Sequence, residues 1–239
     1  MANQWFKFKK FMIRQDRCAM KVGTDSVILG SWVRIGEART ALDIGTGTGL
    51  LALMLAQRSY LLQVDALEID AQAASQAAKN VKESAFSDRV NVIRGDFRDF
   101  SIQTDKRYDL IISNPPYFQR SIAPSDLPRM VARHAQKLGA AEILEKSGEL
   151  LRPEGQLCMV MPFEQVEVVV SGALASGLYP ARLLEIHATQ GSGPKRSCVL
   201  FSLQKPVHPV TERLVIEEGG RHRYSDEYVQ LTKDFYLDF

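Results

Sequence analysis

The residues with the clearest chemical potential form the run Asn114-Pro115-Pro116-Tyr117, directly after an apolar stretch at residues 108–113. Two consecutive prolines remove backbone donors and hold the chain rigid, so a plain strand terminator is one interpretation. That interpretation leaves the asparagine and the tyrosine unexplained. The Asn114 carboxamide oxygen and the Pro115 carbonyl can accept both hydrogens of a planar NH2 group, which frees the nitrogen lone pair to attack a methyl sulfonium. Tyr117 can stack on the base that carries the amine. We therefore predict catalytic roles for Asn114, Pro115 and Tyr117.

A glycine-rich run, Leu42-Asp-Ile-Gly-Thr-Gly-Thr-Gly49, predicts a cofactor site. It follows a predicted strand and opens a predicted helix, whose N-terminus offers free N–H groups and a positive dipole end. Glycines allow a tight turn and a close approach of the backbone to a ligand. The candidates for cofactor binding here are Asp43, Gly45, Gly47 and Gly49. From Gly47 to Ala52 the sequence also fits the dinucleotide pattern GxGxxA. The loop alone therefore does not distinguish a nicotinamide cofactor from S-adenosylmethionine.

Acidic residues follow the next two predicted strands. Glu68 lies 23 residues after Gly45, where a carboxylate can accept hydrogen bonds from both ribose hydroxyls of a cofactor. Asp70 is a rival for this role, but it is better placed to cap the following helix. Asp96 could accept a hydrogen bond from the amino group of a cofactor adenine, with Phe97 packed on the ring. The alternative for Asp96 is a solvated turn residue.

Short β-rich runs alternate with helical stretches, which is typical of βαβ units and a parallel sheet. The order and chain length predict one α/β domain over residues 1–239, with an N-terminal appendage (1–39), a catalytic core (40–205) and a C-terminal extension (206–239). Two strands joined without a helix should form an antiparallel pair at the sheet edge. The predicted strands are residues 40–44, 64–68, 90–94, 108–113, 156–161, 182–187 and 197–204. The predicted helices are residues 25–33, 49–58, 71–83, 140–151 and 165–176.

Composition sets limits on the class of protein. Of 239 residues, 45% are hydrophobic and 24% are charged, as in ordinary globular proteins, and the formal net charge is only +2. Three widely spaced cysteines without a CxxC pair suit a reducing cytoplasm, so we expect a cytoplasmic protein. No secretory signal and no membrane span are expected. The sequence contains no pattern typical of a metal site and indicates no obligatory protein partner.

Positive charge is concentrated at the N-terminus. Six basic residues and one acid lie between Met1 and Lys21, interleaved with Trp5, Phe6, Phe8 and Phe11. Such a segment can track a phosphate backbone and stack bases, although an edge strand protected by lysines fits equally well. The candidate RNA-binding residues are Lys7, Lys9 and Lys10, with Arg129, Arg133, Lys195 and Arg196 as smaller candidates on loops.

The four motifs LDIGTGTG, ALEID, GDF and NPPY stand in the order and spacing of a known family. Over about residues 40–205 the chain resembles the class I, Rossmann-like methyltransferases that act on amino nitrogens. The resemblance implies a seven-stranded, mostly parallel sheet with an antiparallel final strand. It also implies S-adenosylmethionine as the methyl donor and no metal.

Both ends of the chain carry a closer resemblance. Residues 8–30 are similar to the opening of the bacterial tRNA1(Val) (adenine-37-N6)-methyltransferases, and residues 224–237 are similar to that family's C-terminus. The resemblance implies methylation of an adenine N6 in tRNA, at adenine 37 beside the anticodon. It also implies that Lys21, Thr24 and Asp25 lie over the cofactor, although Thr24 or Asp25 could equally be a helix N-cap.

Other functions share parts of this pattern. A protein glutamine N5-methyltransferase uses NPPY for a carboxamide nitrogen, but such enzymes carry a larger helical domain before the core. DNA adenine methyltransferases usually add a target-recognition domain, for which the chain leaves no room. Methylation of another RNA amino group stays open. An oxidoreductase leaves NPPY unexplained, and a non-enzymatic RNA-binding protein would bind no S-adenosylmethionine.

Overall fold

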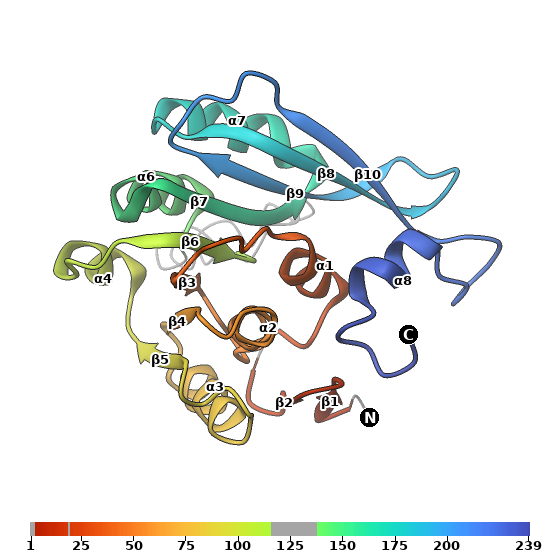
Figure 1. Cartoon of the computed structure of the whole chain (residues 1–239), viewed down its shortest axis with the longest axis horizontal. Coiled ribbons are helices and arrows are strands. Elements are labelled where there is room, and N and C mark those ends of the chain that lie inside the picture. The colour runs from red at the N-terminus through yellow and green to blue at the C-terminus, as the bar shows by residue number, and fades with distance from the viewer. Residues whose placement is uncertain (1–2, 19, 116–137) are drawn as a thin grey trace, which may run out of the picture.

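The computed structural model describes residues 3–18, 20–115 and 138–239. Through this part of the chain runs an eight-stranded sheet with helices on both faces (Figure 1). In sheet order, its strands are β10 (Val210–Glu217), β8 (Tyr179–Thr189), β9 (Pro194–Ser202), β7 (Leu151–Pro162), β6 (Tyr108–Ser113), β3 (Thr40–Ile44), β4 (Gln63–Glu68) and β5 (Val90–Arg94).

The helices form two layers, each over its own hydrophobic core. One layer holds α1 (Thr24–Trp32), α2 (Leu50–Arg58), α3 (Ala71–Lys82) and α8 (Asp226–Thr232). The other holds α4 (Phe97–Gln103), α6 (Ala140–Leu150) and α7 (Val166–Ala175), which follows the short 3-10 turn η2 (Phe163–Gln165). In the described residues, no helix is both long and apolar enough to cross a membrane.

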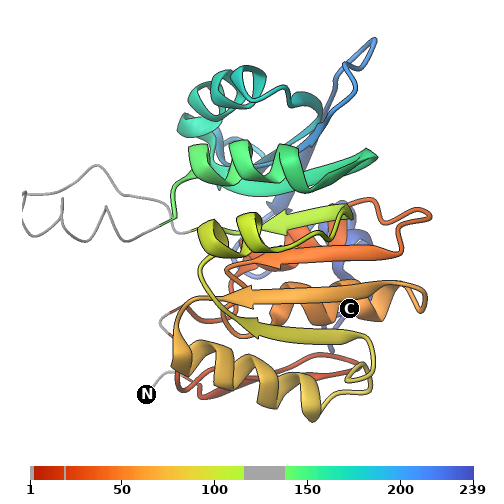
Figure 2. The same ribbon diagram turned by 90° about the vertical axis from the view of Figure 1, so that its left-hand side faces the viewer.

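Seven of the eight strands point in one direction, so their carboxyl ends meet at one edge of the sheet (Figure 2). β3 pairs with β4 on one side and with β6 on the other. The chain reverses its winding direction at this point, and open α/β sheets bind ligands in the crevice outside such a switch. All seven predicted strands are present, and the predicted α/β class is confirmed.

β9 is the reversed strand, and it lies between β7 and β8 rather than at the edge. The prediction of an antiparallel pair is therefore confirmed, but its predicted edge position is wrong. An eighth strand, β10, comes from the predicted C-terminal extension and covers β8 in parallel register. Its sequence, VTERLVIE, alternates only weakly, because a half-exposed edge strand needs few apolar residues.

A partly buried cluster of three side chains attaches β10 to the rest of the domain. The Arg182 guanidinium donates to Glu212 Oε1 through Nε (2.9 Å) and Nη2 (2.6 Å). It also lies over the Trp32 ring at 4.4 Å, while the Trp32 indole N–H donates to Glu212 Oε2. One ion pair thus joins β8, β10 and α1.

The two ends of the chain pack against each other. Residues 5–14 form a separate hairpin of β1 (Trp5–Lys7) and β2 (Met12–Arg14). Phe8 and Phe11 at its tip are 1% and 6% exposed, and both belong to the core that also holds Phe235. Of the two interpretations of the N-terminal segment, base stacking by its aromatic side chains is therefore wrong for Phe8 and Phe11.

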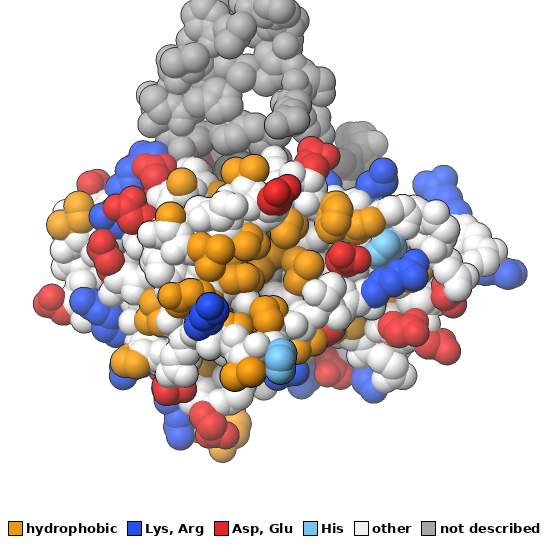
Figure 3. All heavy atoms as spheres, turned by 90° about the horizontal axis from the view of Figure 1, so that it is seen from above, with side chains coloured by type: hydrophobic (Ala, Val, Ile, Leu, Met, Phe, Trp, Pro, Cys, Tyr) orange, Lys and Arg blue, Asp and Glu red, His pale blue; other side chains and the backbone are white. Residues whose placement is uncertain are grey.

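Apolar side chains gather on the face that carries α7 (Figure 3). The exposed apolar side chains of α7 include Val168 and Leu174, and Val210 is exposed at the start of β10.

Lys9 has a structural role that distinguishes it from its neighbours. Its Nζ donates to the carbonyl oxygens of Lys233 and Phe239, both at 2.6 Å, and so ties the hairpin to the C-terminal segment. We predict that Lys9→Ala lowers the melting temperature by about 2–4 °C, the shift that roughly 1 kcal/mol produces in a domain of this size. Lys10→Ala, at the neighbouring exposed position, is the control and should leave it unchanged. Equal shifts in the two variants, measured by calorimetry, would contradict this role.

Candidate functional site

The glycine loop between β3 and α2 has a backbone that only glycine adopts readily. Gly45, Gly47 and Gly49 have φ values of 71°, 58° and 83°. These values lie in the left-handed region, where a side chain costs free energy. The N–H groups of Gly45 and Thr46 donate to the Leu67 carbonyl, which fastens the loop to the end of β4.

Asp43 supports this loop from behind and does not line the cavity in front of it. It is fully buried, and its Oδ2 accepts hydrogen bonds from the Thr46 hydroxyl and the Ala52 N–H. Its Oδ1 has no hydrogen-bond partner among the described residues. Burial raises the pKa of Asp43 to about 7, and the two hydrogen bonds oppose that rise only partly.

Glu68 ends β4 and faces the loop. Its Oε2 accepts the Gly47 N–H at 2.8 Å, and its Oε1 accepts the Asp70 N–H at 2.9 Å. These bonds hold a carboxylate that is only 8% exposed at the wall of the cavity. Asp70, the sequence rival, caps α3 by accepting the N–H groups of Gln72 and Ala73, as predicted.

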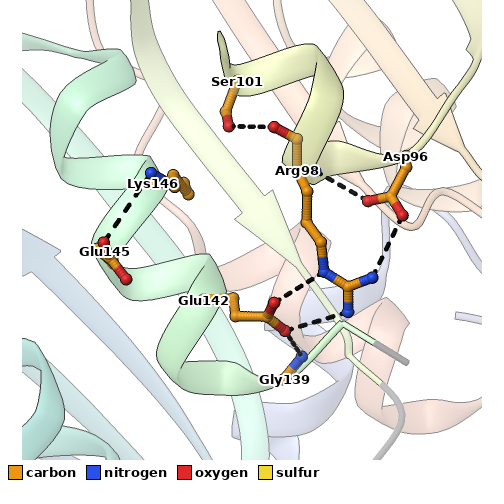
Figure 4. Close-up of polar contacts among 7 residues, drawn as sticks. All are labelled: Asp96, Arg98, Ser101, Gly139, Glu142, Glu145 and Lys146. Atoms are coloured by element: carbon orange, nitrogen blue, oxygen red, sulfur yellow. Dashed lines mark hydrogen bonds and ion pairs between the residues drawn. The ribbon is translucent and has the colours of Figure 1, made fainter. Parts of the chain in front are cut away.

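Asp96 caps α4 and belongs to a charged network (Figure 4). Its Oδ1 accepts the Arg98 N–H at 2.9 Å, and its Oδ2 lies 3.3 Å from Arg98 Nη1. Arg98 Nε also donates to Glu142 at 2.7 Å, and this bond lowers the pKa of Glu142. Glu142 accepts the Gly139 N–H in turn, so the network fixes the N-terminus of α6 beside Asp96. The solvated-turn interpretation of Asp96 is therefore wrong.

Asn114 follows β6 and is held by α1. Its Nδ2 donates to the Ser26 hydroxyl at 2.8 Å. Because a carboxamide is planar, the bond to its nitrogen also orients its oxygen, which accepts no hydrogen bond from any of the described residues. Asn114, Pro115 and Ser26 all line the cavity. Tyr117, Arg129 and Arg133 lie outside the described residues.

These groups surround one cavity of about 700 Å³ at the carboxyl edge of the sheet. The volume falls within the range of about 300–1,000 Å³ that is typical of small-molecule sites. The lining of the cavity includes the glycine-loop backbone, three carboxylates, the Asn114 carboxamide and the apolar side chains of Ile69, Phe97 and Leu138. Among the described residues, no group of three His, Cys, Asp or Glu side chains could hold a metal ion.

Most predicted cofactor-binding residues line this cavity, but three do not. Gly45, Gly47, Glu68, Asp96 and Phe97 line it, as does Lys21. Asp43 lies behind the loop, Gly49 is the N-cap of α2, and Thr24 is in the first turn of α1. The N-cap alternative for Thr24 and Asp25 is also wrong, because Gly23 occupies that position.

The predicted RNA-binding residues that the structure describes lie in two places. Arg196 Nε pairs with Asp25 at 2.9 Å, which places it and the exposed Lys195 beside the N-terminus of α1, near Ser26. The hairpin tip with Lys7, Lys9 and Lys10 lies farther away. Phe11 contacts Phe86 beyond the end of α3, whereas Arg17 bonds to the middle of that helix and lines the cavity.

Sequence reasoning missed residues that act through other residues. Ser26 lies in a segment that the family resemblance singled out, but nothing in its spacing marks it as a partner of Asn114. Nothing in the sequence distinguishes Arg98 from an ordinary surface charge, because its partner Glu142 lies on α6. Such partners become visible only when elements distant in the sequence pack together.

Comparison with known families gives a match over most of the chain. Residues 18–169 match the family model described as "Methyltransferase small domain". Relatives named "tRNA1(Val) (adenine(37)-N6)-methyltransferase" are similar over nearly the whole chain. The one from Parabacteroides distasonis is 43% identical and the one from Tolumonas auensis 45% identical, covering 99% of this chain and 99% and 98% of the relatives. The one from Trichodesmium erythraeum is 43% identical, with 100% of both chains covered.

Solved structures share the fold at low identity. A predicted O-methyltransferase from Agrobacterium tumefaciens superposes with a TM-score of 0.69 at 18% identity, covering 88% of this chain and 96% of that one. A ribosomal protein L11 methylase from Lactobacillus delbrueckii subsp. bulgaricus gives a TM-score of 0.54 at 15% identity, with 81% and 84% covered. At these identities the structures support the fold alone.

The buried Asp43 predicts a pH dependence of stability. Its folded pKa, about 7, is above the ordinary value of 3.8, so the folded protein binds this proton more tightly than the unfolded chain does. Its stabilising effect is complete below about pH 4 and is lost as the pH rises to about 7. Asparagine keeps an acceptor oxygen and does not ionise. The melting temperature of Asp43→Asn should therefore rise relative to wild type between pH 5 and pH 8. A difference that stays constant over this range would show that burial does not raise this pKa.

Proposed function

This chain belongs to the bacterial tRNA1(Val) (adenine(37)-N6)-methyltransferase family, and we propose that it transfers a methyl group from S-adenosylmethionine to N6 of adenine 37 in tRNA1(Val). One observation carries the proposal. The glycine loop with Glu68 and the Asn114-Pro115 pair line a single cavity, so a cofactor and a planar amine can meet there. We infer that the enzyme works in the cytoplasm, where its tRNA substrate is.

The residues at the cavity fit S-adenosylmethionine. Glu68 presents a buried carboxylate for the ribose hydroxyls, and Asp96 offers a carboxylate beside the apolar wall that Phe97 provides for the adenine. Because glycine has no side chain, the backbone of the glycine loop can approach the ligand closely. When bound, the cofactor supplies an activated methyl group on a sulfonium, so neither a metal nor a covalent enzyme intermediate is needed.

Asn114 and Pro115 prepare the attacking amine. The Asn114 oxygen accepts one N6 hydrogen and the Pro115 carbonyl accepts the other. Both bonds draw the nitrogen lone pair out of conjugation with the ring and aim it at the methyl carbon. Ser26 fixes the Asn114 carboxamide through its nitrogen, so the oxygen is in place before the substrate arrives. Tyr117 would stack on the flipped adenine.

Contacts outside the cavity must hold the tRNA, because one flipped base gives little affinity. Arg17 and Lys21 line the cavity, and Lys195 and Arg196 lie near it at the start of β9. We propose that these four residues contact phosphates close to the target base. Lys7 and Lys10 lie at the far end of the hairpin and would reach more distant phosphates.

The first test concerns the amine acceptor. Asn114→Ala should lower the single-turnover rate of methyl transfer to an unmodified tRNA1(Val) transcript by roughly 100-fold or more, the order seen when one group aimed at the reacting atoms is removed. Affinity for S-adenosylhomocysteine should stay close to that of wild type, because the cofactor lies on the glycine loop. Asn91→Ala is the matched control, since Asn91 lies near the start of the edge strand β5 and does not line the cavity. An Asn114→Ala rate near that of wild type would show that this assignment is wrong.

The second test concerns the tRNA surface. Each phosphate contact releases counterions, so the logarithm of the binding constant falls linearly with the logarithm of salt concentration. Lys195→Ala and the pair Lys7→Ala/Lys10→Ala should both weaken tRNA binding and flatten that slope in filter-binding titrations. Lys205→Ala is the control, because it follows the end of β9 at the sheet edge opposite the cavity. Slopes identical in all three would place the tRNA on another face.

A further inference from the structure

Two buried carboxamides project from α3 toward the N-terminal segment. Gln76 and Asn80 are 3% and 1% exposed, although glutamine and asparagine are usually found at the surface. They are four residues apart and therefore lie on one face of the helix. Ala77, on the same part of α3, packs within 3.5–3.7 Å of the position that a side chain at Gly49 would occupy. This face of α3 therefore touches both the glycine loop and the N-terminal segment.

The Asn80 side chain forms hydrogen bonds with both backbone groups of Arg14, as a neighbouring strand would, and with the glycine loop. Its Oδ1 accepts the Arg14 N–H at 2.9 Å, and its Nδ2 donates to the Arg14 carbonyl at 2.9 Å. The same Nδ2 donates to the Thr48 carbonyl at 2.8 Å. One side chain thus satisfies backbone groups of two segments that lie 34 residues apart in the sequence.

Gln76 fixes the next part of the N-terminal segment. Its Oε1 accepts the Arg17 N–H at 2.9 Å, and its Nε2 donates to Asp16 Oδ1 at 2.7 Å. Gln15 then closes the segment on itself, because its Oε1 accepts the Val22 N–H at 2.8 Å. Beyond these anchors, Arg17, Cys18, Met20 and Lys21 line the cofactor cavity.

We infer that Gln76 and Asn80 are positioning residues for the cofactor: they hold residues 14–18 and 20–22 in place as a wall of its cavity. The inference rests on the proposed function, since it takes the cavity ligand to be S-adenosylmethionine. Asn80 has the larger role, because it joins this wall to the glycine loop. The N-terminal segment is therefore part of the cofactor site in addition to any contact that it makes with tRNA.

The variants Asn80→Leu and Gln76→Met remove the hydrogen-bonding groups at similar volume. Each variant removes hydrogen bonds to part-buried backbone groups of Arg14 or Arg17, so we expect S-adenosylhomocysteine to bind at least about tenfold more weakly by calorimetry. Leu178→Ala is the control for general destabilisation, since Leu178 is fully buried next to α7 and does not line the cavity. It should lower the melting temperature and leave the affinity unchanged.

Cys18 gives a second readout that a loss of stability alone would not produce. It lines the cavity, whereas Cys158 and Cys198 are fully buried, so iodoacetamide should label the folded protein at Cys18 alone. In wild type, S-adenosylhomocysteine should slow this labelling. In Asn80→Leu, labelling without ligand should be faster and the protection by ligand should shrink. Burial raises the pKa of Cys18 to about 11, so the reaction is best followed near pH 9.

Wild-type affinity and wild-type Cys18 protection in both variants would overturn this inference alone. Failure of the wild type to bind S-adenosylhomocysteine would overturn the proposed function and this inference with it. If Asn80→Leu does not fold, amide hydrogen exchange in the wild type tests the inference. The Arg14 and Arg17 amides, which donate to the two carboxamides, should exchange more slowly with S-adenosylhomocysteine present. Unchanged exchange at both amides would overturn the inference.

Discussion

The left-handed backbone of the glycine loop is the constraint around which the site is arranged. Three glycines with positive φ turn the chain between β3 and α2, and the loop is held from every side. Asp43 binds it from behind, Glu68 accepts the Gly47 amide in front, and Asn80 donates to the Thr48 carbonyl. The elements that carry these three residues, β3, β4 and α3, are therefore fixed relative to one another by the loop that the cofactor must approach. A substitution that displaced this backbone would shift the ribose acceptor and the N-terminal wall together.

The sheet topology brings the second half of the site to the same place. β6 pairs with β3, so the Asn114-Pro115 acceptors follow a strand directly beside the one that leads into the glycine loop. Ser26 of α1 and the Arg98–Glu142 pair then orient the polar groups of Asn114 and Asp96. Alignment of this kind can supply roughly 7–11 kcal/mol of a barrier in favourable cases. That amount suits a reaction in which the methyl donor is already activated.

Much of the fold and part of the site could be predicted from the sequence. Parallel strands buried on both faces are apolar over most of their length, as in residues 108–113, and glycine and proline runs mark the turns that follow them. The same patterns located Glu68, Asp96 and Asn114 at strand ends. They did not predict β10, because its half-exposed residues alternate only weakly. They also did not predict the burial of Phe8 and Phe11, because that burial depends on C-terminal residues such as Phe235. Gln76 and Asn80 look like surface residues of an alanine-rich helix, because their burial arises only when the N-terminal segment packs on α3.

The measurement that tests the central claim most directly is the position and chemistry of the transferred methyl group. Unmodified tRNA1(Val) transcript would be incubated with the protein and isotopically labelled S-adenosylmethionine, then digested to nucleosides and to oligonucleotides for mass spectrometry. We expect N6-methyladenosine at position 37 and none in a transcript that carries guanosine there. A methyl group on another atom or nucleotide, or on a protein glutamine with none on tRNA, would contradict it.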